Sequence, residues 1–140
     1  MGTRIGVAEF LENVSKLKKK EDKIAALQAN DSYILRTILQ GAFDPRIKWA
    51  LPEGTPPYKV NDLVDQENVL IKDVRKLVYF VEGGSPNMKA LKRETLFIEF
   101  LESLAPADAK MILAMKEKKL PWKSITPQLV NEAFPGFLPE

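Results

Sequence analysis

Apolar residues recur at helical spacing along almost the whole chain, so its pattern predicts a helical protein. The first stripe, Val7, Phe10, Leu11, Val14 and Leu17, lies on one face of a helix. Later stripes comprise Ile24 with Leu27; Ile34, Leu35, Ile38 and Leu39; Leu70, Val74, Leu77, Val78 and Val81; Phe97, Phe100, Leu101 and Leu104; and Met111, Ile112 and Met115. The last of these predicts a helix from Ala107 to about Lys118 that turns its lysines outward. Ordinary core packing explains all of these stripes.

One long irregular stretch, from Phe43 to about Gln66, interrupts this pattern. It contains Pro45, Pro52, Gly54, Pro56 and Pro57. We expect a loop with one short helical turn at DPRIKWA, where Asp44 caps and Pro45 begins the turn. The sequence shows no convincing alternation of apolar and polar residues of the kind typical of strands. It therefore predicts a compact all-α fold, a single domain over residues 1–140, with one long proline-rich loop.

The chain ends in a well-delimited helix. Thr126 can cap it and Pro127 suits its first turn. Leu129, Val130, Ala133 and Phe134 share one side, and Pro135-Gly136 ends the helix. A short segment of this kind is expected to dock on a core or to lead into another domain.

Composition narrows the possible chemistry. The 140 residues include no cysteine and no histidine, which excludes disulfides, thiolate catalysis, Cys/His metal sites and imidazole bases. No cofactor is expected. The net charge is +2 and the pI about 8.8, a mildly basic balance that does not by itself indicate nucleic acid. No apolar run is long enough for a membrane span, so we expect a cytoplasmic protein.

The basic residues form three groups. The first, which we interpret as a solvated junction between helices, is Lys16, Lys18, Lys19, Lys20 and Lys23. The second, after a Gly-Gly-Ser-Pro break, is Lys89, Lys92 and Arg93. The third is Lys110, Lys116, Lys118, Lys119 and Lys123.

The third group directly precedes the last helix, and two interpretations of it stay open. In one, the hydroxyls of Ser124 and Thr126 and the unpaired N–H groups of the helix start bind an anion such as phosphate beside the lysines. In the other, Thr126 only caps the helix, Trp122 packs as an anchor and the lysines solvate the turn.

Four segments together resemble a known family. They are SYILRTILQGAFDPRIKWAL, LVYFVEGG, LFIEFLESLAPADAKMILAMKEKKL and SITPQLVNEAFPGFLPE. In order and spacing they resemble the N-terminal DNA-binding domain of T-even-phage-type ATP-dependent DNA ligases, over about residues 24–140. In those ligases a nucleotidyltransferase domain with a Lys-x-Asp-Gly motif follows, whereas this sequence contains no Asp-Gly pair. The resemblance therefore implies the DNA-binding module alone and no enzyme activity.

The resemblance also implies a mechanism. Such domains hold duplex DNA around a nick by backbone and minor-groove contacts with little sequence preference, so duplex or nicked DNA is the expected partner. It further implies a phage-encoded protein of replication, repair or recombination in the host cytoplasm. The DNA-binding residues expected here are Arg46, Lys48, Lys89, Lys92, Arg93, Lys116, Lys118, Lys119, Lys123, Ser124 and Thr126.

Two other functions are compatible with the sequence. An interaction protein could reuse the fold to bind or inhibit a phage or host protein through an apolar patch near Trp49, Tyr58 and Trp122. An enzyme could use carboxylates of one helix, or a cation held by carboxylates before it, although surface helices carry such groups routinely. The residues concerned are Glu94, Glu99 and Glu102, and Asp62 with Asp65 or Glu67.

Overall fold

Helices make up the regular structure of the protein, which confirms the predicted all-α class. The computed structural model describes residues 6–61 and 67–139. Its elements are α1 (Val7–Ser15), α2 (Lys20–Ala29), α3 (Tyr33–Phe43), α4 (Glu67–Asp73), the 3₁₀ helix η1 (Val74–Phe80), α5 (Ala90–Ser103), α6 (Pro106–Lys116) and α7 (Pro127–Ala133). In the described part of the chain β-pairing is limited to an isolated antiparallel bridge between Trp49 and Val81.

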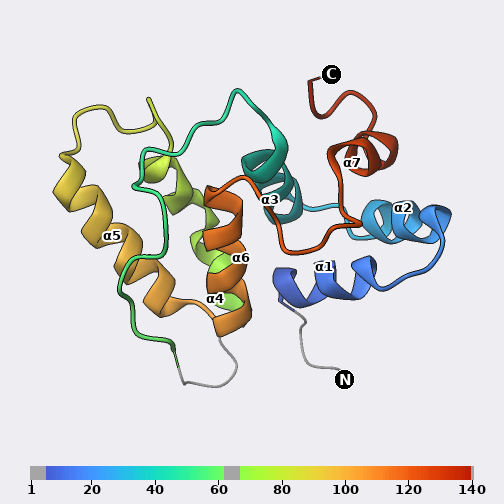
Figure 1. The fold of residues 1–140 in the computed structure, drawn as a ribbon, viewed down its shortest axis with the longest axis horizontal. Helices are drawn as coiled ribbons and strands as arrows, with labels where there is room; N and C mark the ends of the chain where they lie inside the picture. The colour runs from blue at the N-terminus through green and yellow to red at the C-terminus, as the bar shows by residue number, and fades with distance from the viewer. Residues whose placement is uncertain (1–5, 62–66, 140) are drawn as a thin grey trace.

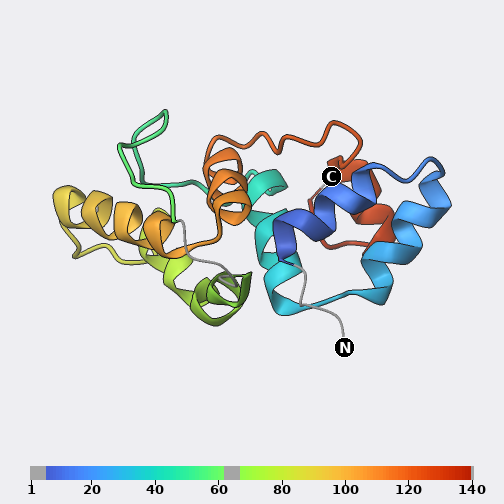
Figure 2. The same ribbon diagram turned by 90° about the horizontal axis from the view of Figure 1, so that it is seen from below.

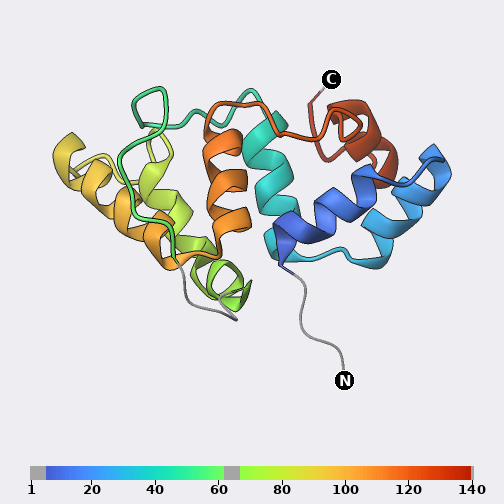
Figure 3. The same cartoon turned by 60° about the horizontal axis from the view of Figure 1, so that its bottom comes forward.

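Helix α6 is the centre of the arrangement. It contacts α3 and α1 on one side and α5 on the other, while α7 packs on α2. Figure 1 shows α5 at one end of an elongated molecule and the pair α2–α7 at the other. The views in Figures 2 and 3 show the same order, with the segment after α6 running across α3 toward α7. Elements near opposite ends therefore do not share a site.

The predicted stripes form the core. Each of these helical elements contributes buried apolar side chains to one cluster. Leu11, Ile38, Leu101 and Ile112 are completely buried, which confirms the inward faces predicted from the sequence. Leu17 is an exception, because α1 ends at Ser15 and Leu17 follows in the exposed connection to α2.

The fourth stripe differs from the predicted α-helical one. After Asp73 the helix tightens from α to 3₁₀ winding, which has three residues per turn. Val74, Leu77 and Phe80 therefore face the core at intervals of three, and Phe80 is 1% exposed. Val78, which an α-helix would turn inward, is 49% exposed.

The long proline-rich loop is confirmed up to Asn61, but its predicted helical turn is wrong; residues 62–66, at the predicted end of the loop, lie outside the described residues. At Asp44 the backbone forms a hydrogen-bonded turn, with Ile47 N donating to Asp44 O at 3.1 Å. The chain then extends, because Ala50 N donates to Phe80 O at 2.7 Å and Lys48 O accepts from Glu82 N at 2.8 Å. These bonds tie the loop to the segment that follows η1.

The last helix docks on the core as its sequence predicted. Thr126 Oγ1 accepts from Leu129 N at 3.1 Å, which confirms the cap, and Pro127 begins the helix. Helix α7 packs on α2, where Gln28 Nε2 donates to Ala133 O at 2.9 Å. Beyond it, Gly136 adopts a positive φ of 77° and Asn131 holds the backbone of Leu138 through both of its amide atoms.

Candidate nucleic-acid interface

Lys116 points into the protein, so the expectation that it faces solvent is wrong. The side chain is 3% exposed. Its Nζ donates to Pro52 O and Gly54 O, each at 2.9 Å, and pairs with Glu117. The proline-rich loop closes over the last turn of α6 and leaves these two carbonyls without helical or sheet partners, so the lysine satisfies them. Its amine is not available to a phosphate.

Lys118 is also occupied within the protein. Its Nζ donates to Gly41 O at 2.8 Å and to Asp44 O at 2.9 Å, at the end of α3. Burial lowers the pKa of this amine, and the nearby Asp44 carboxylate opposes that effect. The residue has a φ of 63° and ends α6 in the left-handed conformation usually taken by glycine. Lys118 N and Lys119 N then bond back to Met115 O and Ala114 O.

The Arg46 guanidinium is exposed but bound to a buried carboxylate. Arg46 Nη2 lies 2.8 Å from Asp44 Oδ2, with the arginine side chain 68% and the aspartate 0% exposed. Asp44 Oδ1 also accepts from Arg46 N at 2.9 Å. The Arg46 side chain is the main cause that holds the pKa of Asp44 well below its usual range, so this carboxylate stays charged. Lys48, close by in the chain, is exposed.

The second basic group lies at the far end of the molecule. Lys89 and Lys92 are exposed at the start of α5. Arg93 instead donates to three backbone carbonyls that fasten the Gly-Gly-Ser-Pro turn to the helix, those of Tyr79, Ser85 and Met88. Figure 1 shows this end of α5 opposite the end that carries α2 and α7. The three predicted basic groups therefore do not form one surface.

The structure does bring residues of the first and third groups together. Ser124 Oγ donates to Ser15 O at 3.1 Å, across 109 residues of sequence. This bond sets the turn before α7 against the end of α1. A hollow of about 280 Å³ opens there, lined by Lys18, Lys20, Lys23, Ser124, Thr126, Gln128, Leu129 and Glu132. Lys123 lies beside it in the chain.

Lys18 lines this hollow, and Lys16, Lys19 and Lys123 lie within two residues of its lining in the chain. Lys20 pairs with Glu132 at 2.6 Å, and Lys23 Nζ donates to Leu17 O. Within residues 6–61 and 67–139, no hydrogen bond or ion pair engages the exposed amines of Lys16, Lys18, Lys19 and Lys123. We call these four residues the lysine edge. No local pattern indicates that residues 16–19 and 123 would meet, because only the folded chain joins them.

The hydroxyls predicted to bind an anion at the start of α7 have partners inside the protein. The Ser124 hydroxyl donates to a carbonyl and the Thr126 hydroxyl caps the helix. Trp122 is half-buried and packs against the core. Of the two interpretations left open by the sequence, capping by Thr126 is confirmed. The hydroxyls at the start of α7 are therefore taken up within the protein, and the free cations nearby are lysine amines.

The carboxylates considered for an enzyme do not form a described metal site. Glu102 Oε2 accepts from Lys59 N at 2.8 Å. Asp62 and Asp65 lie outside the described residues, and the structure does not describe the Glu67 side chain. Among the residues that were described, no group of three or more carboxylates lies together as a metal site requires. None of the described helices is both long enough and apolar enough to cross a bilayer.

The fold and site define a small all-α protein with a lysine-rich surface at one end. The chain belongs to a family of unknown function, DUF6433, whose profile matches residues 10–121. The matched region runs from within α1 to just beyond α6 and includes the first and second basic groups. Helix α7, which completes the hollow beside the lysine edge, follows it. No curated protein matches the chain in sequence.

Proposed function

We propose that the protein binds duplex or nicked DNA through the sugar–phosphate backbone, largely independently of sequence and without catalysing a reaction. The observation that carries this proposal is the lysine edge. Four exposed amines from two distant parts of the chain are held at one end of the molecule by the Ser124–Ser15 hydrogen bond. Neutralising phosphates with such amines releases counterions, which favours binding to any sequence.

The type of cation also supports backbone binding. Lysine presents a compact point charge on a flexible stem, whereas recognition of base edges typically uses the planar fork of arginine. Of the described arginines, Arg36, Arg46 and Arg93 are held by protein groups, namely Asp31, Asp44 and backbone carbonyls, while Arg75 is exposed on η1, outside the lysine edge. The amines free to meet a polyanion are therefore suited to positioning DNA rather than to reading its sequence. The resemblance to ligase DNA-binding domains points to the same role.

The proposed binding residues differ in part from those expected from the sequence. Lys119, Lys123, Lys48, Lys89 and Lys92 remain exposed candidates. Lys116, Lys118 and Arg93 are assigned to holding the fold, because protein carbonyls already occupy their donors. Lys16, Lys18 and Lys19 enter the site in their place.

The test is an anisotropy titration of labelled duplex, intact or nicked, at several salt concentrations. Changing Lys16, Lys18, Lys19 and Lys123 together to glutamine should weaken binding by about tenfold or more at low salt. The slope of log K against log salt should fall by about 0.9 for each phosphate that the variant no longer neutralises. A comparison of the affinities for nicked and intact duplex measures whether the protein prefers a nick, as the ligase resemblance implies.

The matched control removes four exposed lysines elsewhere: Lys59, Lys72, Lys76 and Lys110. It has the same net charge as the first variant, so a specific site predicts a clearly smaller loss of affinity. Equal losses in both variants, or an unchanged salt slope in the first, would contradict the lysine edge. A third variant, with Lys89 and Lys92 changed to glutamine, measures whether the opposite end also contacts DNA.

A second function, binding of a phage or host protein, is favoured by a different surface from the one expected. Trp49, Tyr58 and Trp122 are half-buried and packed on the core, so they offer no exposed aromatic patch. Tyr33 and Val78 are instead 66% and 49% exposed, and both line a hollow of about 260 Å³ that Trp49 also lines. A Val78→Lys variant that loses a stoichiometric partner but keeps DNA affinity would support this function over the first.

A further inference from the structure

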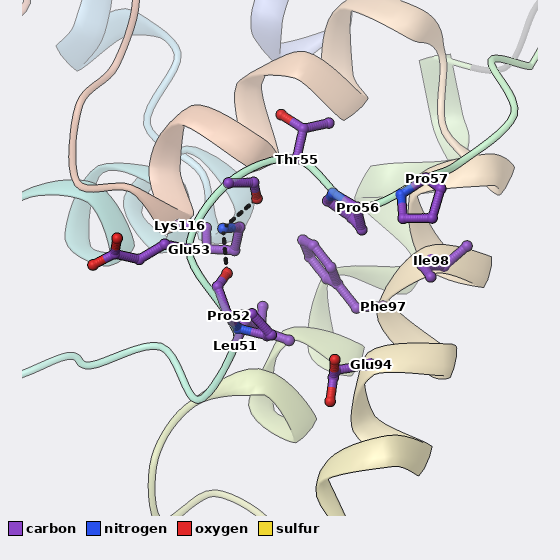
Figure 4. A pocket seen from close by; sticks show the side chains of 11 residues that line it. Leu51, Pro52, Glu53, Thr55, Pro56, Pro57, Glu94, Phe97, Ile98 and Lys116 are labelled. Atoms are coloured by element: carbon purple, nitrogen blue, oxygen red, sulfur yellow. Dashed lines mark hydrogen bonds between the residues drawn. The ribbon is translucent and has the colours of Figure 1, made fainter.

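A small pocket lies between the proline-rich loop and α5, remote from the lysine edge. Its volume is about 190 Å³. Figure 4 shows the loop curving around Lys116 and facing the side chains of α5. The apolar lining comes from Leu51, Pro52, Pro56, Pro57, Phe97 and Ile98.

The size of the pocket limits its occupant to one side chain or a group of similar size. An apolar cavity of about 150 Å³ accommodates benzene, whereas pockets for drug-sized ligands begin at about 300 Å³. A helix or an extended peptide cannot enter it as a whole. A single projecting side chain can.

The pocket offers few hydrogen-bond donors, and the Thr55 hydroxyl is the one side-chain donor of its described lining besides Lys116. Pro52, Pro56 and Pro57 have no N–H group. Gly54 N donates to Glu117 Oε2 at 3.3 Å, and Lys116 Nζ is taken up by two carbonyls and by Glu117. The positive charge of Lys116 is therefore compensated. An occupant whose polar groups are hydrogen-bond acceptors would therefore find few donors in this pocket.

Two glutamates, Glu53 and Glu94, complete the lining, and Figure 4 shows the Glu53 carboxylate turned away from the side chains of α5. Glu94 is half-buried on α5 and lines the pocket together with Phe97 and Ile98, which follow it at helical i+3 and i+4 spacing. Among the described residues, no hydrogen bond or ion pair engages the Glu94 carboxylate. An apolar stem and a cationic head rich in donors would match this combination of surfaces.

We propose that the pocket receives an arginine side chain of a partner polypeptide. The aliphatic stem packs against Phe97, Ile98 and Pro56, and the guanidinium donates to the Glu94 carboxylate. Arginine fits because its stem is apolar and its head carries five donors and no acceptor. The prolines restrict the loop before binding, which lowers the ordering cost. This site is independent of DNA binding, since its charge has the opposite sign.

The test titrates the ¹⁵N- and methyl-labelled protein with the peptide acetyl-Gly-Arg-Gly-amide. The control peptide carries citrulline, a neutral side chain of nearly the same shape, in place of arginine. We expect shifts at Gly54 and Ile98, and binding about fivefold tighter for arginine than for citrulline, as one partly screened ion pair would give. No shift at these residues, or equal affinity for the two peptides, would overturn the proposal.

Two variants at matched positions localise the effect. Glu94→Gln should abolish the preference for arginine, whereas Glu99→Gln, on the exposed face of the same helix, should keep it. Loss of the preference in both variants would indicate attraction to the general charge of α5 and would exclude the pocket. The variant lacking the lysine edge should bind the arginine peptide as the wild type does, so failure of either proposal leaves the other measurable.

Discussion

The end of α6 and the lysine edge contain the same type of side chain in opposite situations. Lys116 and Lys118 each donate to two backbone carbonyls. Lys123, only a few residues later, is exposed beside the junction of α1 and α2. The difference lies in what faces each amine. Lys116 meets two carbonyls of the proline-rich loop and Lys118 meets two carbonyls at the end of α3, whereas Lys123 is exposed beside a junction that the Ser124–Ser15 bond already closes.

This contrast separates the charge of a sequence from the charge available at a surface. A buried carbonyl without a donor costs free energy, so a nearby lysine is drawn into the structure even though its desolvation is unfavourable. Of the three lysines in the KEKK segment, residues 116–119, Lys116 and Lys118 bind protein carbonyls and only Lys119 is exposed to solvent. Variants of individual lysines can test this division.

The largest effect is expected from Lys116→Met. This change keeps most of the side-chain volume but leaves Pro52 O, Gly54 O and Glu117 without their donor. We expect the free energy of unfolding to fall by about 2–4 kcal/mol, because Pro52 O and Gly54 O both lose a charged hydrogen-bond donor. Urea denaturation followed by circular dichroism measures it.

Lys119→Met is the matched control for that experiment. The Lys119 side chain is exposed, so the change in the free energy of unfolding should stay within about 0.5 kcal/mol. Similar losses in the two variants would remove the distinction between structural and available lysines at the end of α6.

A smaller effect is expected at Lys118, where two effects of opposite sign can be separated. Lys118→Met removes the bonds to Gly41 O and Asp44 O but keeps a non-glycine residue at positive φ. Gly41 O keeps the Trp49 indole N–H at 3.0 Å and Asp44 O keeps Ile47 N at 3.1 Å, so neither is left without a donor and we expect a loss of about 0.5–1.5 kcal/mol. Lys118→Gly removes the same bonds and relieves about 1–2 kcal/mol of left-handed strain.

The glycine variant should therefore be more stable than the methionine variant, as measured by the same urea titration. If methionine were equal to glycine, the backbone at this position would carry no strain. If both matched the wild type, the amine bonds would contribute nothing to stability.

The sequence predicted the helices better than the site, for a physical reason. Periodicity reports which side of a helix is apolar, and it identified inward residues such as Leu11, Ile38 and Ile112. It missed the 3₁₀ winding of η1, because Val74, Leu77, Val78 and Val81 fit an α-helical stripe equally well. The spacing of three residues between Val74, Leu77 and Phe80 could not be recognised, because Val78 is apolar as well although it does not face the core.

The site depends on contacts that no local pattern contains. Lys116 belongs to a helix whose outward face looked polar, yet a loop more than 60 residues earlier supplies its acceptors. Ser124 and Ser15 are separated by 109 residues. Local features of α7 were predictable, because Thr126 and Pro127 act on their own helix. The environment of each lysine was not.

The smallest expected effect tests the boundary of the lysine edge by adding to it. Lys20 is paired with Glu132 at 2.6 Å, with both side chains partly exposed. Glu132→Gln would free this amine beside the same hollow and remove one negative charge from its lining. We expect DNA affinity to rise about two- to fivefold at low salt and the salt slope to steepen by up to about 0.9, the value for one further neutralised phosphate. Stability should change by less than about 1 kcal/mol, because the pair is on the surface.

Glu82→Gln, an equal change of charge at an exposed site after η1, is the control. If it raises affinity and slope as much as Glu132→Gln does, net charge rather than the lysine edge governs binding.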